Sequence, residues 1–260
     1  MADIEYTVIN GVAWIRLNRP ETKNSFTLEM VDQWAGFLRD AGADQRVGAV
    51  VLTGTGTCFC SGVDLAVMQD LVDQNDALAW KSLLWERVHR IAFALEQLDK
   101  PVIAAVNGAA VGAGMDMSLM CDMRFASRHA RFCEGYIRLG AVPGDGGCYF
   151  LSRLVGVAKA LELLMSGEFV DADEALRIGL VNRVCEHADL EAATQAFAEK
   201  LISHNPLAIR MIKRSVYQSL NLDMRTSLDL ISSHMGIVQT NTRAARALAE
   251  FRGGAAKAKE

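Results

Sequence analysis

Hydrophobic and polar side chains alternate along residues 4–18, and after residue 27 the hydrophobic ones recur at helical spacing. The alternation predicts two strands joined at Asn10-Gly11, a dipeptide typical of the type I′ hairpin turn. The helical spacing predicts a helix to about residue 41 with Thr27 as N-cap, carried by Leu28, Val31, Trp34, Phe37 and Leu38. The chain is therefore expected to begin with a hairpin and an amphipathic helix.

Beyond this point, short apolar runs are interspersed with helical segments. Strands are predicted at 47–53, 102–106, 122–126 and 130–132, and helices at about 76–98, before Lys100-Pro101, and at about 113–121. From Lys159 the pattern is helical almost to the end, with Asp171, Asn205 and Asn221 as candidate N-caps.

Strands that alternate with helices through the first 185 residues predict an α/β core. The helical region that follows is too apolar to stand alone, so we expect it to pack on that core or on a partner subunit. We divide the chain into a core of residues 1–195 and a helical region of residues 196–260, with no linker that would separate two domains.

Composition narrows the class of protein. Hydrophobic residues make up 51% of the chain and charged residues 22%, so it can bury a substantial core and intrinsic disorder is excluded as its main state. The formal net charge is −4, whereas nucleic-acid-binding domains usually carry a basic excess. We therefore expect no nucleic-acid partner.

Cysteine and histidine spacing argues against a disulfide scaffold and a metal site. The six cysteines include no CxxC pair and the five histidines no HxxxH, so no metal is predicted. Free thiols and an N-terminus without signal-peptide features predict a cytoplasmic protein. The apolar stretch 102–120 is interrupted by Asn107, Asp116 and three glycines, which favours a buried strand and helix over a membrane span.

Glycines concentrate in three loops that follow predicted strands, at residues 54–65, 107–116 and 138–147. Such loops lie at the carboxyl ends of strands, where α/β proteins bind ligands. Two of them facing each other would supply a pair of backbone N–H donors suited to an oxyanion. The glycine order GAAVGAG differs from the dinucleotide-binding fingerprint, and no GxxxxGK[ST] phosphate loop exists.

Five segments share the order and spacing of one known family: LNRPETKNSF, AVVLTGTGTCFCSGVDL, KPVIAAVNGAAVGAGMDMSLMCDMRFAS, RLGAVPGDGG and RLVGVAKALELLMSGEFVDADEALRIGLVNRV. Together they resemble the enoyl-CoA hydratase/isomerase (crotonase) superfamily, in register from about residue 4 to 220. The resemblance implies a core of repeated ββα units, a helical C-terminal trimerisation region, and a homotrimer or a dimer of trimers. It also implies an acyl-CoA thioester substrate, with coenzyme A entering as part of that substrate and no permanently bound cofactor or metal.

The resemblance assigns the family's oxyanion hole to the backbone N–H groups of Val63 and Ala113. These groups would hydrogen-bond the thioester carbonyl and stabilise an enolate-like transition state. The segment Val63, Asp64, Leu65 and Ala66 is expected to line the adenine and pantetheine path together with Ala113.

The acid/base positions depart from the pattern of typical hydratases, which have two glutamates. The first position is Asp116, three residues beyond Ala113 and so on the same helix face. The second is Tyr136, which is either a pocket wall or a donor to substrate or water. Asp145 in PGDGG is either a replacement base or water-holder, or an Asx-type residue that caps the next helix.

Three further residues have competing interpretations. We expect Glu134 to be a loop residue paired with a nearby arginine rather than a catalyst. His89 matches the general-base position of the dehalogenase branch, but a histidine in this setting is more often structural. Asp122 is expected to anchor structure rather than perform chemistry.

The leading functional hypothesis is a lyase that adds water reversibly across the double bond of an enoyl-CoA. Val63 and Ala113 would polarise the thioester, and Asp116 and Asp145, helped by Tyr136, would move the protons. The alternative is an enoyl-CoA or dienoyl-CoA double-bond isomerase that uses the same enolate. A specialised acyl-CoA hydrolase, or a CoA-binding relative without catalysis, is a third hypothesis.

Overall fold

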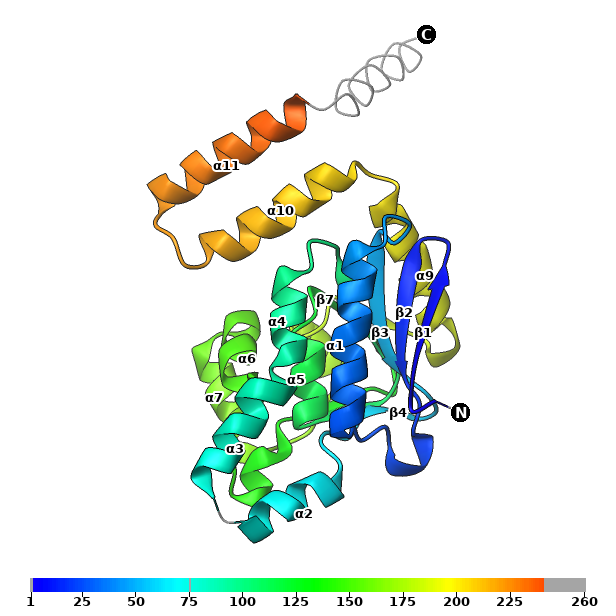
Figure 1. The fold of residues 1–260 in the computed structure, drawn as a ribbon, viewed down its shortest axis with the longest axis vertical. Coiled ribbons are helices and arrows are strands. Elements are labelled where there is room, and N and C mark those ends of the chain that lie inside the picture. The colour runs from blue at the N-terminus through cyan, green and yellow to red at the C-terminus, as the bar shows by residue number, and fades with distance from the viewer. Residues whose placement is uncertain (1, 75, 241–260) are drawn as a thin grey trace.

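The computed structural model describes residues 2–74 and 76–240 (Figure 1). Its larger sheet has the spatial order β1 (Ile4–Ile9), β2 (Val12–Leu17), β3 (Ala49–Gly54), β5 (Val102–Val106), β7 (Met123–Ser127) and β10 (Arg183–Cys185). A smaller sheet has the order β4 (Cys58–Cys60), β6 (Ala109–Val111), β8 (Arg131–Cys133) and β9 (Val170–Asp171). Strands β3, β5 and β7 lie in the large sheet and the strands that follow them, β4, β6 and β8, in the small one. This is the predicted repeated ββα core.

The helices are α1 (Leu28–Ala43), α2 (Leu65–Gln74), α3 (Ala77–Leu83), α4 (Arg90–Gln97), α5 (Ala113–Leu119), α6 (Gly147–Val155), α7 (Val157–Ser166), α8 (Ala172–Arg177), α9 (Leu190–Ile202), α10 (Pro206–Ser219) and α11 (Met224–Gln239). Short 3-10 turns lie at Pro20–Thr22, Gly135–Leu139 and His187–Asp189. The predicted helical region extends to residue 260, and its part at 241–260 lies outside the described residues.

The central strands are buried on both faces, which explains why they are apolar runs rather than alternating ones. Every residue of β3 is buried. Val50 and Leu52 belong to the main core, which includes Trp34 of α1, whereas Val51 belongs to a second core that Phe197 and Leu201 of α9 join from the other face.

Local sequence signals fix several element ends. Asn10 and Gly11 have φ values of 49° and 79°, as a type I′ turn requires, so the hairpin prediction is confirmed. The hydroxyl of Thr27 accepts a hydrogen bond from the Met30 N–H, and Asp171 and Asn205 cap α8 and α10 as predicted.

Two element predictions are wrong. Asn221 lies in the turn that closes α10, and α11 is instead capped by Asp223, whose carboxylate accepts the N–H groups of Arg225 and Thr226. The single helix predicted at 76–98 is divided into α3, a five-residue π-helical turn at Leu84–Val88, and α4. Leu84 and Val88 are spaced by four residues, as neighbours on one face of an ordinary α-helix are, so periodicity does not reveal the turn.

The apolar stretch 102–120 forms β5, β6 and α5. Within the described residues, no helix combines the length and the apolar character that crossing a membrane requires.

Candidate active site

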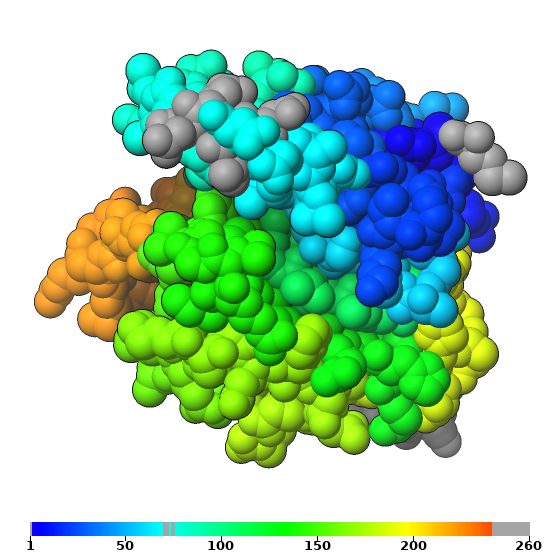
Figure 2. Space-filling view, turned by 90° about the horizontal axis from the view of Figure 1, so that it is seen from below, coloured from blue at the N-terminus to red at the C-terminus, as the bar shows by residue number. Residues whose placement is uncertain are grey.

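The loops that follow β4 and β6 meet because these strands are parallel neighbours in the small sheet. Gly62 has a φ of 101°, and a β-carbon at this position would lie 3.5 Å from the Ala113 nitrogen. The amide of Val63 is therefore next to the start of α5. Figure 2 views this end of the molecule, where the α2–α3 segment in cyan lies beside the blue N-terminal segment, with green residues of the later loops below it.

The backbone N–H groups of Val63 and Ala113, at this junction, have no acceptor in the described part of the chain. Phe26 bridges to Val63 in parallel fashion, donating to the Gly62 carbonyl and accepting from the Asp64 N–H at 2.9 Å each. This pattern bonds the neighbours of Val63 and leaves its own N–H free. Ala113 is the first residue of α5, so its N–H lacks an intrahelical partner.

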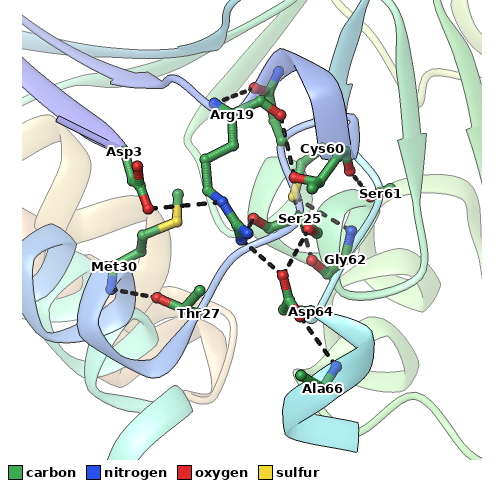
Figure 3. A network of polar contacts seen from close by, with 12 residues as sticks. Asp3, Arg19, Ser25, Thr27, Met30, Cys60, Ser61, Gly62, Asp64 and Ala66 are labelled. Atoms are coloured by element: carbon green, nitrogen blue, oxygen red, sulfur yellow. Dashed lines mark hydrogen bonds and ion pairs between the residues drawn. The ribbon is translucent and has the colours of Figure 1, made fainter. Parts of the chain in front are cut away.

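The segment after Val63 is held by a polar network centred on Asp64 (Figure 3). Its carboxylate accepts from Arg19 at 2.8 Å, from the Ser25 hydroxyl at 3.3 Å and from the Ala66 N–H at 3.0 Å. A cavity of about 430 Å³ opens beside this network, lined by Thr22, Lys23, Ser25, Ser61, Val63, Asp64 and Leu65. Val63, Asp64 and Leu65 of the predicted CoA-binding segment thus border one cavity.

A buried acidic cluster lies behind Ala113. The Tyr136 hydroxyl is 2.8 Å from Oδ2 of Asp116 and 2.7 Å from Oδ2 of Asp145. Asp116 is fully buried, and Asp145 is 2% exposed. The Tyr136 ring faces Gly112, where a β-carbon would lie 3.7 Å from ring carbon Cε2. Three residues that are far apart in the sequence therefore form one cluster adjacent to the loop that presents the Ala113 N–H.

Comparison with known proteins assigns this arrangement to a family. The family model for "Enoyl-CoA hydratase/isomerase" matches residues 7–251. This chain belongs to the enoyl-CoA hydratase/isomerase family.

Individual relatives agree with this assignment. The chain is 37% identical over 227 residues to a short-chain-enoyl-CoA hydratase of Clostridium acetobutylicum, covering 86% of this chain and 85% of that protein. It is 35% identical over 217 residues to a trans-2-decenoyl-[acyl-carrier-protein] isomerase of Streptococcus mutans, covering 84% and 82% respectively. The crystal structure of enoyl-CoA hydratase from Bacillus anthracis superimposes with a TM-score of 0.90 at 30% identity, covering 97% of each chain.

The surroundings of Asp116 in this cluster bring the pKa of its carboxyl close to neutral pH. Burial, and then the neighbouring charge of Asp145, raise the pKa of Asp116 to about 7, although hydrogen bonds from Tyr136 and Glu134 act in the opposite direction. Burial also raises the pKa of Asp145 and, assisted by the charge of Asp116, holds the pKa of Tyr136 well above its usual value. Tyr136 therefore remains a hydroxyl donor, while Asp116 gains and loses its proton near neutral pH.

Glu134 does not behave as the sequence suggested. We expected it to pair with an arginine, but in the described part of the chain neither of its carboxyl oxygens meets a donor, and it is only 1% exposed. It lies against Asp116 instead, where burial and the Asp116 charge raise its pKa to about 10. The Asp116–Glu134 contact spans 18 residues, so no local sequence signal indicated it.

The remaining candidates have structural contacts. His89 Nε2 lies 2.8 Å from the Gly144 carbonyl, so its ring binds the loop that carries Asp145. Asp145 does not cap α6, whose N-cap is Gly146 without a side-chain bond, so the Asx-type interpretation is wrong. Asp122 accepts the Val102 N–H and the Lys213 ammonium, each at 2.8 Å, and is an anchor as predicted.

No group of three or more His, Cys, Asp or Glu side chains suited to a metal ion occurs among residues 2–74 and 76–240. Arg19 is a site residue that the sequence analysis did not include. Its pairing with Asp64 joins residues 45 positions apart, and no short motif signals it.

We expect Asp64→Asn to raise the KM for a CoA thioester about tenfold, the equivalent of about 1.4 kcal/mol. The neutral amide loses the charge-assisted bond to Arg19, so the segment next to Val63 loses its fixed position. Steady-state kinetics measure this effect, with kcat less affected than KM. Asp73→Asn, an exposed aspartate near the end of α2, is the matched control, and an equal KM for both variants would contradict the prediction.

Proposed function

We propose that this family member catalyses the reversible hydration of an enoyl-CoA double bond. The observation that carries the proposal is the position of two unpaired N–H donors, on Val63 and Ala113, beside the buried cluster of Asp116, Tyr136 and Asp145. A thioester carbonyl held between the two N–H groups is polarised toward an enolate, which lowers the barrier to attack at the β-carbon.

Hydration needs a base for the attacking water and an acid for the α-carbon, and the cluster supplies both. The Tyr136 hydroxyl carries one hydrogen but has two carboxyl oxygens within 2.8 Å. It donates to one aspartate, and the contact to the other requires a proton on that carboxyl. One aspartate is then ionised and accepts the proton of water, while the other is protonated and returns a proton to the α-carbon.

The sequence relatives support this reaction, because several at about 35% identity are named as hydratases. Double-bond isomerisation is a second candidate, and one observation favours it. The Tyr136 hydroxyl lies between the two aspartates and bonds both of them, so no water molecule is needed in that position. An aspartate can then take a proton from one carbon of the substrate and return it to another carbon of the enolate, which moves the double bond.

Coenzyme A enters this proposal only as part of the thioester. The polarising N–H groups and the proton-carrying side chains all belong to the chain, so the proposed reaction requires no further cofactor. The cavity of about 430 Å³ beside Asp64 is within the usual size range of small-molecule sites and is the proposed location of the CoA moiety.

Incubation with crotonyl-CoA and with longer and aromatic enoyl-CoAs tests the proposal, since hydration removes the conjugated absorbance. Mass spectrometry of the products distinguishes the two candidates. A gain of one water supports the hydratase, whereas an unchanged mass with a shifted chromophore supports the isomerase. Binding of these thioesters without any reaction would refute both.

Tyr136→Phe is expected to move the acidic limb of the kcat/KM profile to higher pH and to reduce turnover at pH 7 by at least about tenfold. The hydrogen bond from Tyr136 lowers the pKa of Asp116, so its loss raises that pKa above about 7. Activity that requires ionised Asp116 is present above this pKa and is lost as the pH falls through it. Tyr149→Phe removes an exposed phenol on α6 and serves as the control; an unmoved limb in Tyr136→Phe would contradict the prediction.

We also propose that the chain assembles into a homotrimer through its last two described helices. In Figure 1, α10 and α11 lie side by side away from the core, and they pack mainly on each other. The orange segment that projects from the side of the molecule in Figure 2 belongs to this region. Their exposed apolar side chains are Ile212, Val216, Tyr217, Leu220, Met224, Leu228, Ile231, Met235 and Ile237, with Leu222 between the helices. Apolar surface of this extent on two projecting helices is typical of an interface between subunits.

The anchoring of these helices supports assembly between copies of this chain. Lys213 binds Asp122 and Arg214 binds Asp99, so α10 has a fixed orientation on the core. Sedimentation equilibrium is expected to give a trimer or a dimer of trimers, and Ile231→Glu is expected to dissociate it. A wild-type monomer at micromolar concentration would refute the proposed assembly.

A further inference from the structure

Glu134 is a buried carboxyl for which the proposed reaction has no direct use. It directly follows β8 and is 1% exposed, and the described chain offers no N–H or O–H donor to either of its oxygens. Oδ1 of Asp116 has no hydrogen-bond partner in the described chain either, and the nearest donor to this carboxyl besides Tyr136 and Glu134 is the Gly147 N–H, which lowers its pKa. An ionised carboxylate in that position is very costly, because burial removes the water that stabilises its charge.

The two orphaned carboxyls face the same point. A β-carbon at Gly147 would lie 2.5 Å from Oδ1 of Asp116 and 2.9 Å from Oε1 of Glu134. With both groups ionised, two negative charges would confront each other inside the protein. A proton between them converts the same geometry into a hydrogen bond, and it gives a partner to both groups at once.

The contacts of the whole cluster fix the number of protons. Asp145, Tyr136, Asp116 and Glu134 form a row with three contacts between acidic oxygens. Each contact needs one hydrogen, because two oxygens that present only lone pairs repel each other. Three hydrogens shared by these four acidic groups leave the cluster with one negative charge. Asp116 carries this charge when both of its neighbours, Tyr136 and Glu134, donate to it.

We propose that Glu134 is a positioning residue of this site: a neutral carboxyl that donates its hydrogen to Asp116 and fixes the orientation of the catalytic carboxylate. The inference rests on the proposed function, because it gives Asp116 its proton-transfer role. Glu134 keeps its proton throughout the reaction and contacts no substrate. Its role is to stabilise the ionised form of Asp116 and to direct the other oxygen of that carboxylate toward Tyr136.

The charged and titratable groups that face Glu134 come from each element packed against it. They are Asp116 on α5, Asp145 in the loop before α6, and Cys148 in the first turn of α6. Tyr136 is two residues further along the same segment and joins the two aspartates. Asp116, Asp145 and Cys148 are acidic, so each of them, when ionised, favours the neutral form of Glu134.

The pH dependence of kcat/KM in two Glu134 variants distinguishes a neutral Glu134 from an ionised one. Glu134→Gln keeps a donor toward Asp116, so the acidic limb of the kcat/KM profile is expected to stay at its wild-type position. Glu134→Met removes the donor and is expected to move the limb upward by about one pH unit. If Glu134 were ionised, both variants would remove a negative charge beside Asp116 and move the limb downward, which would overturn the proposal. Glu168→Gln, on an exposed loop after α7, is the charge control.

Infrared difference spectroscopy tests the proposal without any turnover. At pH 7 the wild-type protein is expected to show the C=O band of a protonated carboxyl that is missing from Glu134→Gln and present in Glu168→Gln. Absence of that band from the wild type would overturn the proposal even if the enzyme proves to be a hydratase. Presence of the band in a protein that hydrates no enoyl-CoA would refute only the proposed function.

Discussion

Asp116→Asn is expected to lower kcat on crotonyl-CoA by about 10²–10⁴, the usual contribution of a general acid or base. An amide cannot accept the proton of the attacking water, and it cannot share a proton with Tyr136 and Asp145. Asparagine has nearly the same shape and its carbonyl still accepts the Tyr136 hydroxyl at the present 2.8 Å position, so the fold should be retained. Steady-state kinetics with the product measured by mass spectrometry give the effect.

The control for Asp116→Asn is Asp173→Asn, which removes an exposed carboxylate on α8. The thermal midpoint of Asp116→Asn is expected to equal or exceed that of the wild type, because the substitution removes a buried charge. A loss of turnover below about tenfold in a correctly folded Asp116→Asn variant would rule out proton transfer by this residue.

Gly114→Ala is expected to lower kcat by about 10²–10³, as the loss of one oxyanion donor does. The second residue of α5 lies directly on β4, and a β-carbon there would overlap the carbonyl oxygen of Cys60. The overlapped carbonyl is backbone and cannot rotate away as a side chain can, so α5 must shift away from β4. The Ala113 N–H then loses its position relative to Val63, and the thioester carbonyl cannot contact both donors.

Gly236→Ala is the matched control for this substitution. Gly236 lies within α11 with no neighbouring atom within 4 Å of the added carbon, so alanine there should stabilise the helix by up to about 1 kcal/mol. Circular dichroism establishes whether Gly114→Ala is folded, and CoA-thioester binding by the folded variant separates a displaced donor from a lost site. Wild-type turnover in folded Gly114→Ala would contradict the assignment of Ala113 as a donor.

The sequence alone predicts most of the fold, because hydrophobic periodicity and capping residues are local signals. Thr27 and the Asn10-Gly11 turn are read directly from neighbouring residues, and β3 from its apolar run. Strands of three residues such as β4 and β6 are too short to produce a period, so they were included in the glycine-rich loops. The apolar residues at the ends of the π-helical turn Leu84–Val88 are four positions apart, as in an ordinary α-helix, so the sequence does not reveal the turn.

The sequence analysis identifies individual site residues, but it does not predict the hydrogen bonds that join them. The resemblance placed Asp116, Tyr136 and Asp145 as separate candidates, and the structure brings them to one hydroxyl. Whether Tyr136 is a wall or a donor depends on a bond across 20 residues to Asp116, which no spacing rule contains. The same is true of Glu134. It is expected to be a loop residue paired with a nearby arginine, whereas the side chain is buried against Asp116, 18 residues away in the sequence.

The central claim is that polarisation by Val63 and Ala113 and proton transfer at Asp116 together add water to an enoyl-CoA. The most direct test is the mass of the product formed from crotonyl-CoA in ¹⁸O-labelled water. We expect one labelled oxygen on the β-carbon with the wild type, formed at a rate about 10²–10⁴ times that of Asp116→Asn. An unlabelled product of unchanged mass, formed at the same rate by both proteins, would contradict the account.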